Sequence, residues 1–560
     1  MTDPNGNVTT FDYFDNADTN FGNRGEVKWV RDARYSATGQ QFEYTYNQYG
    51  QKLTETNLND VVTEYEYGDT WGNLTEVVQD PGMGHLNRTT QMTYDVAGRV
   101  TSSTDPKSQT SSFTYNAVGQ PTQATLPGET VSYTYGANGR TESVTDGRGT
   151  TTMAYETGND RVASVTDPVT GTISYTYGLA GERETVSLPG GGTWTYDYGA
   201  GGILGGVQCI LPKDDPNSLT FMLRNVEDDQ GRVVSYYSDS YGGLHQVRNN
   251  RQYNMSGTLI GYLDAFYTYE ASSGHGRGTL AQIQNVWNSL GMMGWQQTVL
   301  VQNDYTYDDV GNRLTNAISD NNGLIRTEQY GYDTLHRLTS VDYGDGQTQT
   351  YTFDPMGNRT QKTDSVNGNE SYTYNNANML LTRGANSYTN DLNGNTLTGG
   401  GRTNTWDGQN RLTQCVTSSA TTSFVYGADG LRRRSTVSGT STDYILDGQS
   451  VVRDRQGSSN VATYLHGARG PEYRRNDSTG AVRWYLYDGL GSVLGEVDQN
   501  GNITASRKYD VYGSVRASTG TGTSAHRFVG SVGHPSDGDT GLVYMRARYY
   551  DPATGGFESE

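Results

Sequence analysis

Aromatic and small polar residues alternate along most of this chain in a short pattern that recurs about every twenty residues. An aromatic residue, one polar residue and a second aromatic lead into a polar turn with Gly, as in YTYNQYGQKL from Tyr44 and YTYDDVGNRL from Tyr305. The second aromatic stands at positions 46, 67, 94, 115, 135, 155, 177 and 196, and again at 307, 332, 353, 374 and 426. Alternation with a period of two is typical of β-strands, so each repeat predicts a hairpin.

The residues after the second aromatic predict how each hairpin turns. Asp or Asn followed three residues later by Gly is a turn signal, because the Asx side chain bonds nearby backbone and Gly accepts positive φ. Two short strands and two turns account for about twenty residues. One hairpin cannot bury its aromatic face alone, so neighbouring hairpins must stack tyrosine on tyrosine. We therefore expect an all-β fold, a long antiparallel sheet that curls or spirals.

The pattern is weakest in the middle of the chain and divides it into four regions. Residues 1–197 and 301–480 are regular hairpins, residues 198–300 are degenerate repeats, and residues 481–560 have motifs of their own. Within 198–300 the best helical candidate is Leu280 to Leu290 (LAQIQNVWNSL). The apolar run GMMGW from Gly291 is expected to pack into the molecule or to form an inward-facing loop.

Composition and charge exclude several classes of protein. The 560 residues carry 61 acids against 41 bases, a net charge of -20, which does not supply the basic face of a nucleic-acid binder. Cys209 and Cys415 allow one disulfide at most, so this is not a disulfide scaffold. The chain opens MTDPNGNVTT, without a signal peptide, and no apolar run is long enough to span a bilayer.

The repeats resemble the YD repeats of the Rhs (rearrangement hot spot) family. Three of them carry the signature most fully, with an aromatic, an acid, a glycine and an arginine in order: Tyr94, Asp95, Gly98 and Arg99; Tyr307, Asp308, Gly311 and Arg313; and Asp354, Gly357 and Arg359. One such match is weak evidence, but the repetition covers most of the chain.

The C-terminal region resembles the Rhs-associated core, and this likeness is far more specific. Its motifs are Asp488, Gly489 and Gly491; Tyr509, Asp510 and Gly513; Arg527, Phe528 and Gly530; and Arg546, Arg548, Tyr549, Tyr550, Asp551 and Pro552. Members of this family, among them toxin complexes and the teneurins, form a hollow β-shell or cocoon that the core closes at one end. The resemblance also implies a secreted or cell-surface protein.

In the toxins of this family, the shell holds a C-terminal toxin polypeptide that an aspartyl-protease-like site cuts free. The present sequence departs from that pattern. Gly556 stands where the family motif YYDPxTGRF has Arg, and the sequence stops at Glu560, before the segments that supply the cleaving aspartates. We therefore expect a truncated core and no enzymatic activity.

No other catalytic or metal-binding constellation is evident. The sequence lacks HExxH, paired CxxC, P-loop and GxSxG motifs, and its seven histidines lack ligand spacing. Calcium-like turns begin at Asp3, Asp391 and Asp498, but none has Gly at the sixth or Glu at the twelfth position of an EF-hand loop. These segments are expected to be turns, and no cofactor is expected.

Two functions fit the sequence. The first is a structural shell that encapsulates or presents a C-terminal polypeptide cargo, ancestrally a toxin. The second is an extracellular or cell-surface adhesion protein whose rows of Tyr and Asn bind carbohydrate. The corresponding partners are an enclosed toxin or effector polypeptide, or a glycan or surface partner; assembly with further copies of the chain fits either function.

Overall fold

The computed structural model describes all residues except 36–38, 180, 200–221, 231, 239–243, 254–258, 270–278 and 523. This described part holds 49 β-strands and three short 3-10 turns, η1 (Phe21–Asn23), η2 (Ala33–Tyr35) and η3 (Gly530–Val532), and no α-helix. The strands form sheets of 31, 14 and 4 strands, and within each sheet every strand pairs antiparallel with the next along the chain. The expected all-β fold of long antiparallel sheets is confirmed.

The 31-stranded sheet takes up the first two thirds of the chain. Its strands are β1 (Thr10–Tyr13), β2 (Val27–Arg31), β3 (Phe42–Tyr46), β4 (Lys52–Thr56), β5 (Val62–Glu66), β6 (Glu76–Gln79), β7 (Arg88–Tyr94), β8 (Val100–Thr104), β9 (Thr110–Tyr115), β10 (Pro121–Leu126), β11 (Glu129–Tyr135), β12 (Thr141–Asp146), β13 (Gly149–Tyr155), β14 (Val162–Asp167), β15 (Gly171–Tyr177), β16 (Arg183–Ser187), β17 (Thr193–Gly199), β18 (Met222–Glu227), β19 (Val233–Ser238), β20 (Leu244–Tyr253), β21 (Leu259–Tyr269), β22 (Leu280–Gly291), β23 (Gly294–Tyr307), β24 (Arg313–Asp320), β25 (Gly323–Tyr332), β26 (Leu338–Asp342), β27 (Thr348–Phe353), β28 (Arg359–Asp364), β29 (Gly368–Tyr374), β30 (Leu380–Arg383) and β31 (Asn386–Ser387).

The two smaller sheets follow. The 14-stranded sheet consists of β32 (Thr389–Asn390), β33 (Thr396–Gly399), β34 (Arg402–Trp406), β35 (Leu412–Val416), β36 (Thr421–Tyr426), β37 (Arg432–Val437), β38 (Thr440–Asp447), β39 (Ser450–Gln456), β40 (Ser459–Gly467), β41 (Gly470–Asn476), β42 (Val482–Tyr487), β43 (Val493–Val497), β44 (Ile503–Tyr509) and β45 (Val515–Gly520). The 4-stranded sheet consists of β46 (Ser536–Asp537), β47 (Leu542–Met545), β48 (Arg548–Asp551) and β49 (Gly556–Phe557).

The repeat starting at Tyr94 shows how the residues of one unit form its hairpin. The Tyr94 hydroxyl donates a hydrogen bond to the Leu74 carbonyl, 2.7 Å away on the preceding hairpin. Asp95 Oδ1 accepts from the backbone N–H of Arg99 at 3.0 Å, and Gly98 between them has φ 76°. The Arg99 guanidinium then lies 4.7 Å from the ring centroid of Tyr115, the second aromatic of the next repeat. Each repeat is thereby bonded to the one before and the one after it.

The two faces of the sheet differ as the alternation predicts. The middle Thr of the aromatic triplet lies on the exposed face and bonds a hydroxyl on the returning strand, as between Thr306 and Thr315 at 2.7 Å. A register shift falls just before the second aromatic, for example between Thr306 and Tyr307. Such bulges increase the local twist of a strand pair, and here they recur with the repeat, so the sheet curls.

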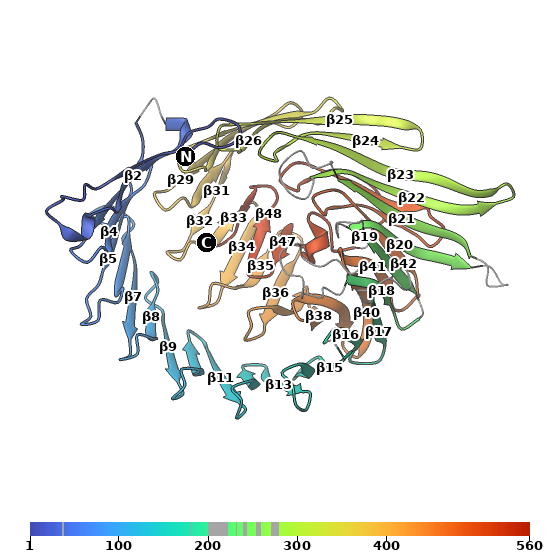
Figure 1. Ribbon diagram of the computed structural model, residues 1–560, viewed down its shortest axis with the longest axis horizontal. Coiled ribbons are helices and arrows are strands. Elements are labelled where there is room, and N and C mark those ends of the chain that lie inside the picture. Colours follow the sequence, from blue (N-terminus) through green and yellow to red (C-terminus); the bar gives the residue numbers. More distant parts are fainter. Residues whose placement is uncertain are drawn as a thin grey trace.

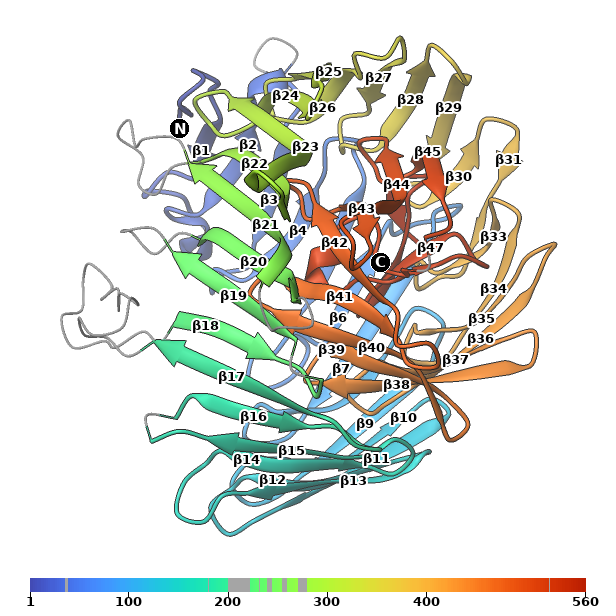
Figure 2. The ribbon, with the colours of Figure 1, turned by 90° about the vertical axis from the view of Figure 1, so that its right-hand side faces the viewer.

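The curled sheet forms a spiral whose successive windings touch through their turns (Figures 1 and 2). The sequence separation between bonded partners falls from 333 residues near the N-terminus to 168 near the C-terminus, so the spiral tightens. Representative contacts are His336 with Asp3, Lys107 with Asp391, Arg453 with the Pro189 carbonyl, Tyr473 with Asp228, the Tyr305 hydroxyl with the Gly489 N–H, and the Tyr343 hydroxyl with the Val511 N–H.

The largest core lies between windings. It joins buried residues of β15–β23 to buried residues of β38–β43, including Trp194 from the earlier winding and Trp484 from the later one. Both indole side chains are almost fully buried. The aromatic face of one winding is therefore covered by the next.

Two expectations for residues 198–300 are wrong. Leu280 to Leu290 is not a helix but belongs to strand β22. The middle of β22 is buried on both faces, with Ile283 and Trp287 on one and Val286 on the other, so its apolar residues do not alternate and their spacing imitates a helical period. The GMMGW run is not an inward-facing loop or packed filler: it forms the tip of the β22–β23 hairpin, where Met292 and Met293 are fully exposed and only Trp295 has a packing contact. The longest apolar run of the sequence, Ile203 to Leu211, lies outside the described residues, and Cys209 lies within that run.

Candidate functional site: the interior seat of the C-terminal segment

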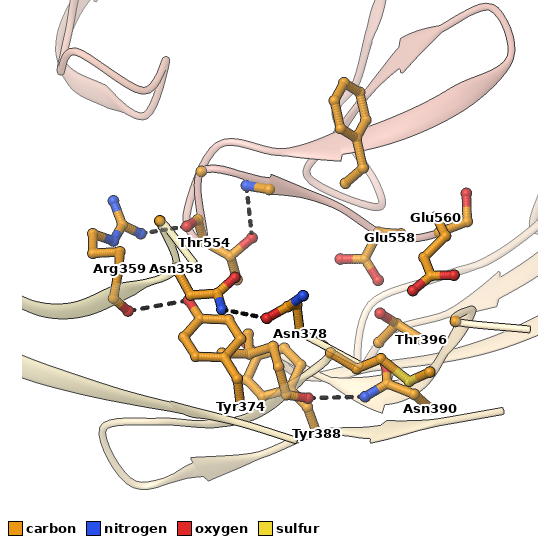
Figure 3. A pocket seen from close by; sticks show the side chains of 18 of the residues that line it. Asn358, Arg359, Tyr374, Asn378, Tyr388, Asn390, Thr396, Thr554, Glu558 and Glu560 are labelled. Atoms are coloured by element: carbon orange, nitrogen blue, oxygen red, sulfur yellow. Dashed lines mark hydrogen bonds between the residues drawn. The ribbon is translucent and has the colours of Figure 1, made fainter. Parts of the chain in front are cut away.

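The C-terminal segment lies near the centre of the spiral in both views of the molecule (Figures 1 and 2). The side chain of the last residue, Glu560, forms an ion pair with Arg88 of β7 at 2.5 Å. Arg88 also donates to the Leu392 carbonyl at 2.7 Å. A cavity of about 600 Å³ borders the segment and is lined by residues of β26–β30, β32 and β33, the turn before β45 and residues 554–560 (Figure 3).

Arg402, the first residue of β34, binds two carboxylates of the C-terminal segment. Its Nη2 lies 2.5 Å from Asp551 Oδ2 and 2.8 Å from Glu558 Oε1, and all three side chains are almost fully buried. The backbone N–H of Thr396 donates to the Glu558 carbonyl at 2.8 Å. Burial raises the pKa of the Glu558 carboxyl to about 7 despite the nearby guanidinium. The Glu558 carboxyl therefore gains or loses its proton near neutral pH.

Arg359, the first residue of β28, lines the cavity and also binds the segment. Its guanidinium donates to the Thr554 carbonyl and, at 3.1 Å, to the Tyr372 hydroxyl. It also lies 4.6 Å from the ring centroids of both Tyr372 and Tyr512. Figure 3 shows Arg359 and Thr554 facing each other across one end of the pocket. A buried arginine with these partners fixes the backbone of the segment rather than one side chain.

The 4-stranded sheet that carries this segment is anchored by aromatic residues. Tyr549 and Tyr426 lie with their hydroxyl oxygens 3.0 Å apart, and Tyr544 accepts a hydrogen bond from the Arg432 backbone at 2.8 Å. The Arg432 side chain pairs with Asp537 at 2.5 Å and is almost fully buried. These contacts join β46–β48 to β36 and β37, so the C-terminal segment is attached to the wall on several sides.

The three fullest repeat signatures occupy equivalent places in their hairpins. Tyr94 donates to the Leu74 carbonyl and Tyr307 to the Leu280 carbonyl, and Asp95, Asp308 and Asp354 accept from turn N–H groups. Gly98, Gly311 and Gly357 have φ of 76°, 90° and 93°. Arg99, Arg313 and Arg359 lie over aromatic rings, at 4.7, 4.3 and 4.6 Å. Only Arg359 also reaches the C-terminal segment.

Of the core motifs, the first two form turns that pack on an earlier winding. Asp488 and Asp510 accept turn N–H groups, and burial raises the pKa of both carboxyls. Gly489 donates to the Tyr305 hydroxyl at 2.7 Å, and Tyr509 donates to the Val493 carbonyl at 2.9 Å. A Cβ at Gly491 would lie 1.9 Å from the Ser531 hydroxyl, and one at Gly513 would lie 2.5 Å from the Phe528 ring.

The remaining core motif residues surround the C-terminal sheet. Arg527 accepts the Val493 and Gly530 N–H groups through its carbonyl, and Phe528 stacks on Tyr550 with centroids 6.2 Å apart. Arg546 donates to the Val532 carbonyl and Arg548 lies over Phe557. Tyr550 donates to the Tyr512 carbonyl, and the Pro552 carbonyl accepts from Ser514. Their roles here are structural contacts.

The chemically reactive residue types do not form a second site in the described part. His466, His526 and His534 are close enough to interact, and burial lowers the pKa of His526 to about 3 and that of His534 to about 4. Burial also raises the pKa of the free Cys415 thiol to about 11. Among the residues with described positions, no three His, Cys, Asp or Glu side chains are arranged to hold a metal ion.

The calcium-like segments are turns. Asp3, Asp391 and Asp498 each accept the N–H of the residue four positions later, at 2.8 to 3.0 Å. No helix in the described part of the chain has the length and apolar character that crossing a membrane requires.

Sequence reasoning missed the residues that hold the C-terminal segment, namely Arg88, Arg402, Arg432 and Glu558. Each binds a partner far away in the sequence, 105 to 472 residues in these cases. A weak signal exists, because Arg402 and Arg432 both start a strand just after a turn, where the repeat places an arginine over a ring. Their carboxylate partners could not be inferred from that position.

With this geometry in view, the comparisons with known proteins identify the family. The model of the Teneurin YD-shell matches residues 236–560, more than half of the chain, and the RHS Repeat model matches residues 94–130 and 115–151. The chain belongs to the YD-shell family. The repeat and core motifs led to this family from the sequence, and that recognition is confirmed.

Curated relatives include much longer proteins. The tRNA3(Ser)-specific nuclease WapA of Bacillus spizizenii is 31% identical over 242 residues, 41% of this chain and 10% of the relative. The Double-stranded DNA deaminase toxin A of Burkholderia cenocepacia is 24% identical over 261 residues, 45% of this chain and 15% of the relative. The chain thus spans about a tenth of the length of the nuclease it matches.

Among solved structures, the chain resembles the TcdB2–TccC3 complex. The form without the hypervariable C-terminal region has a TM-score of 0.57 at 16% identity, covering 95% of this chain and 31% of that one. A second TcdB2–TccC3 structure has a TM-score of 0.56 at 16% identity and covers 99% of this chain and 33% of that one. At this identity the likeness concerns the fold alone.

Proposed function

We propose that this chain is a structural shell that surrounds and holds a C-terminal polypeptide cargo of the toxin type. One observation carries the proposal: Arg402, Arg359 and Arg88 on the surrounding windings bind residues 551–560 near the centre of the spiral. A polypeptide that continued from Glu560 would therefore begin inside the windings. The wall would act by steric exclusion, keeping proteases and partners away from the cargo.

The relatives support a toxin-type cargo. Two of them are named as a nuclease and as a deaminase toxin, and each shares with this chain only a stretch of 242 or 261 residues. We infer that the shared stretch is the shell and that catalysis belongs to other parts of those proteins. The present chain would then have no catalytic residue of its own, and secretion or surface display would suit its role.

The repeat tyrosines favour the shell over carbohydrate adhesion. Their hydroxyls donate to backbone carbonyls of the preceding hairpin, for example Tyr115 to Val100 at 2.8 Å and Tyr177 to Val162 at 2.8 Å. A hydroxyl engaged in this way is less available to a sugar, so the recurrence of tyrosine has a structural cause.

Protease protection of a fused reporter tests the proposal. A small, protease-sensitive reporter joined after Glu560 is compared with the same reporter joined before Met1, near the outer winding (Figure 1). We expect the C-terminal reporter to resist digestion at least about tenfold longer, and the double substitution R359A/R402A to shorten that lifetime. Equal digestion rates at the two ends would contradict the proposal.

A further inference from the structure

The hairpin of β22 and β23 differs in charge from the rest of this acidic chain. No charged residue occurs between Arg277 and Asp304, whereas charged residues make up 18% of the sequence. These strands, of 12 and 14 residues, are also the longest of the described strands. Figure 1 shows the hairpin reaching outward on the side opposite the first strands. Residues 280–303 of this hairpin thus form a long, uncharged arm that projects from the sheet.

Large apolar side chains gather at the end of this arm. Met292 and Met293 are 108% and 97% exposed, and the adjoining Leu290 and Trp295 are 40% and 46% exposed. Gly291 pairs with Gly294, so the two methionines form the turn itself. Exposed apolar groups scattered singly need no explanation, but four within six residues form a patch that is typical of an interaction site.

The adjoining strand β21 contributes one aromatic contact and one paired acid. Trp295 packs against Tyr262 of β21, with ring centroids 5.1 Å apart. The acid nearest in that strand, Asp264, is almost fully buried and pairs with Arg248 at 2.9 Å. On the next hairpin along the wall, Leu324 of β25 is 68% exposed, and Figure 1 shows that this hairpin points the same way.

We propose that the tip of the β22–β23 hairpin inserts into the interface of a lipid bilayer. Met292 and Met293 would lie among the upper acyl chains, and Trp295 at the level of the headgroups, where amphipathic indole rings are favoured. The arm carries no charge that would have to be desolvated, and none that could select a charged protein surface. This inference does not depend on the nature of the cargo.

The net charge of -20 defines which lipid surface fits. Anionic headgroups repel a protein of this charge, whereas zwitterionic headgroups do not. Binding is therefore expected to be strongest on phosphatidylcholine vesicles and weaker when a third of the lipid is phosphatidylserine. Since insertion is apolar, added salt should not release the protein from phosphatidylcholine.

Vesicle flotation tests the proposal. We expect the intact chain to float with phosphatidylcholine vesicles, and M292S/M293S to reduce the bound fraction at least about tenfold. M83S is the matched control, because Met83 is 102% exposed on a different turn and should leave flotation unchanged. Circular dichroism of each variant shows whether the sheets are intact. We expect them to be, because the substituted side chains are exposed.

A second measurement reports how deeply Trp295 enters the bilayer. Brominated acyl chains quench tryptophan at close range, so the intact chain should lose emission on such vesicles and W295F should lose much less. Absence of flotation, or flotation that M292S/M293S leaves unchanged, would overturn the proposal. Self-association in solution that these substitutions abolish, without vesicle binding, would also overturn it and identify the tip as an interface between copies.

Discussion

At the residue scale, each position of the repeat signature has a partner that explains its identity. The Tyr115 hydroxyl reaches the Val100 carbonyl, which links two hairpins across the sheet. Asp95 accepts the Arg99 N–H and binds the Arg99 guanidinium at 2.6 Å, and these bonds hold the pKa of that carboxyl below its ordinary value. Phe in place of Tyr, or Asn in place of Asp, would preserve the shape but lose one of these bonds.

Removing one such hydroxyl should loosen two hairpins. Y115F leaves the ring in place but deletes the bond to Val100, which is expected to cost about 1 kcal/mol. Hydrogen exchange of the amides of β8 and β9 measures this locally. Y49F is the control, since Tyr49 lies largely exposed on a turn. Equal exchange in both variants and the parent would show that the hydroxyl bond contributes nothing.

The buried Glu558 carboxyl, which lies in the binding site of the C-terminal segment, makes the free energy of unfolding depend on pH. Its pKa is raised from 4.5 to about 7, so between these values the folded state retains a proton that the unfolded state has lost. Stability is therefore full below pH 4.5 and falls as pH rises through 7, by about 3 kcal/mol. E558Q, which resembles the neutral acid, should match the parent at pH 4.5 and exceed its stability at pH 8.

Denaturant unfolding of the parent and E558Q at the two pH values checks this expectation. A pH slope that is unchanged in E558Q would show that Glu558 is not the responsible group.

At the element scale, the sequence predicted the hairpins well because their determinants are local. The aromatic alternation, the Asx turn and the glycine all lie within about ten residues of each other. The prediction failed at β22, because the middle of this strand is buried on both faces and Ile283, Val286 and Trp287 therefore do not alternate with polar residues. What covers the second face lies on other strands, so the sequence of one strand does not reveal it.

Alanine substitutions at two turn glycines distinguish the cost of backbone strain from the cost of a steric clash. Gly311 and Gly513 have nearly equal φ, 90° and 95°, but only Gly513 has a neighbour close to the missing Cβ, the Phe528 ring at 2.5 Å. G311A should cost about 1 kcal/mol from its φ alone. G513A should cost about 1–3 kcal/mol more, because Phe528 must move. Equal losses of unfolding free energy would show that the core turn is not packed as described.

At the scale of the whole molecule, the spiral is the feature that the sequence leaves open. The family resemblance implied a shell, but the contacts between windings join residues 168 to 333 positions apart, and no local pattern pairs them. The same winding creates the interior binding site of the C-terminal segment. Arg88 belongs to the outer winding and Glu560 is the last residue of the chain, and the winding brings their side chains into contact. Buried ion pairs such as Arg402 with Asp551 and Arg432 with Asp537 are properties of this assembly rather than of any repeat.

Zero-length carbodiimide cross-linking of the native chain, read by peptide mass spectrometry, tests the spiral most directly. Lys107 Nζ lies 2.9 Å from Asp391, and Lys362 and Lys508 lie 3.5 Å from Asp510 and Asp345. We predict these three intramolecular cross-links alongside the local control between Lys52 and Glu55. Recovery of the local cross-link without the three distant ones, or of the distant ones only between separate molecules, would contradict a spiral that winds around its own C-terminus.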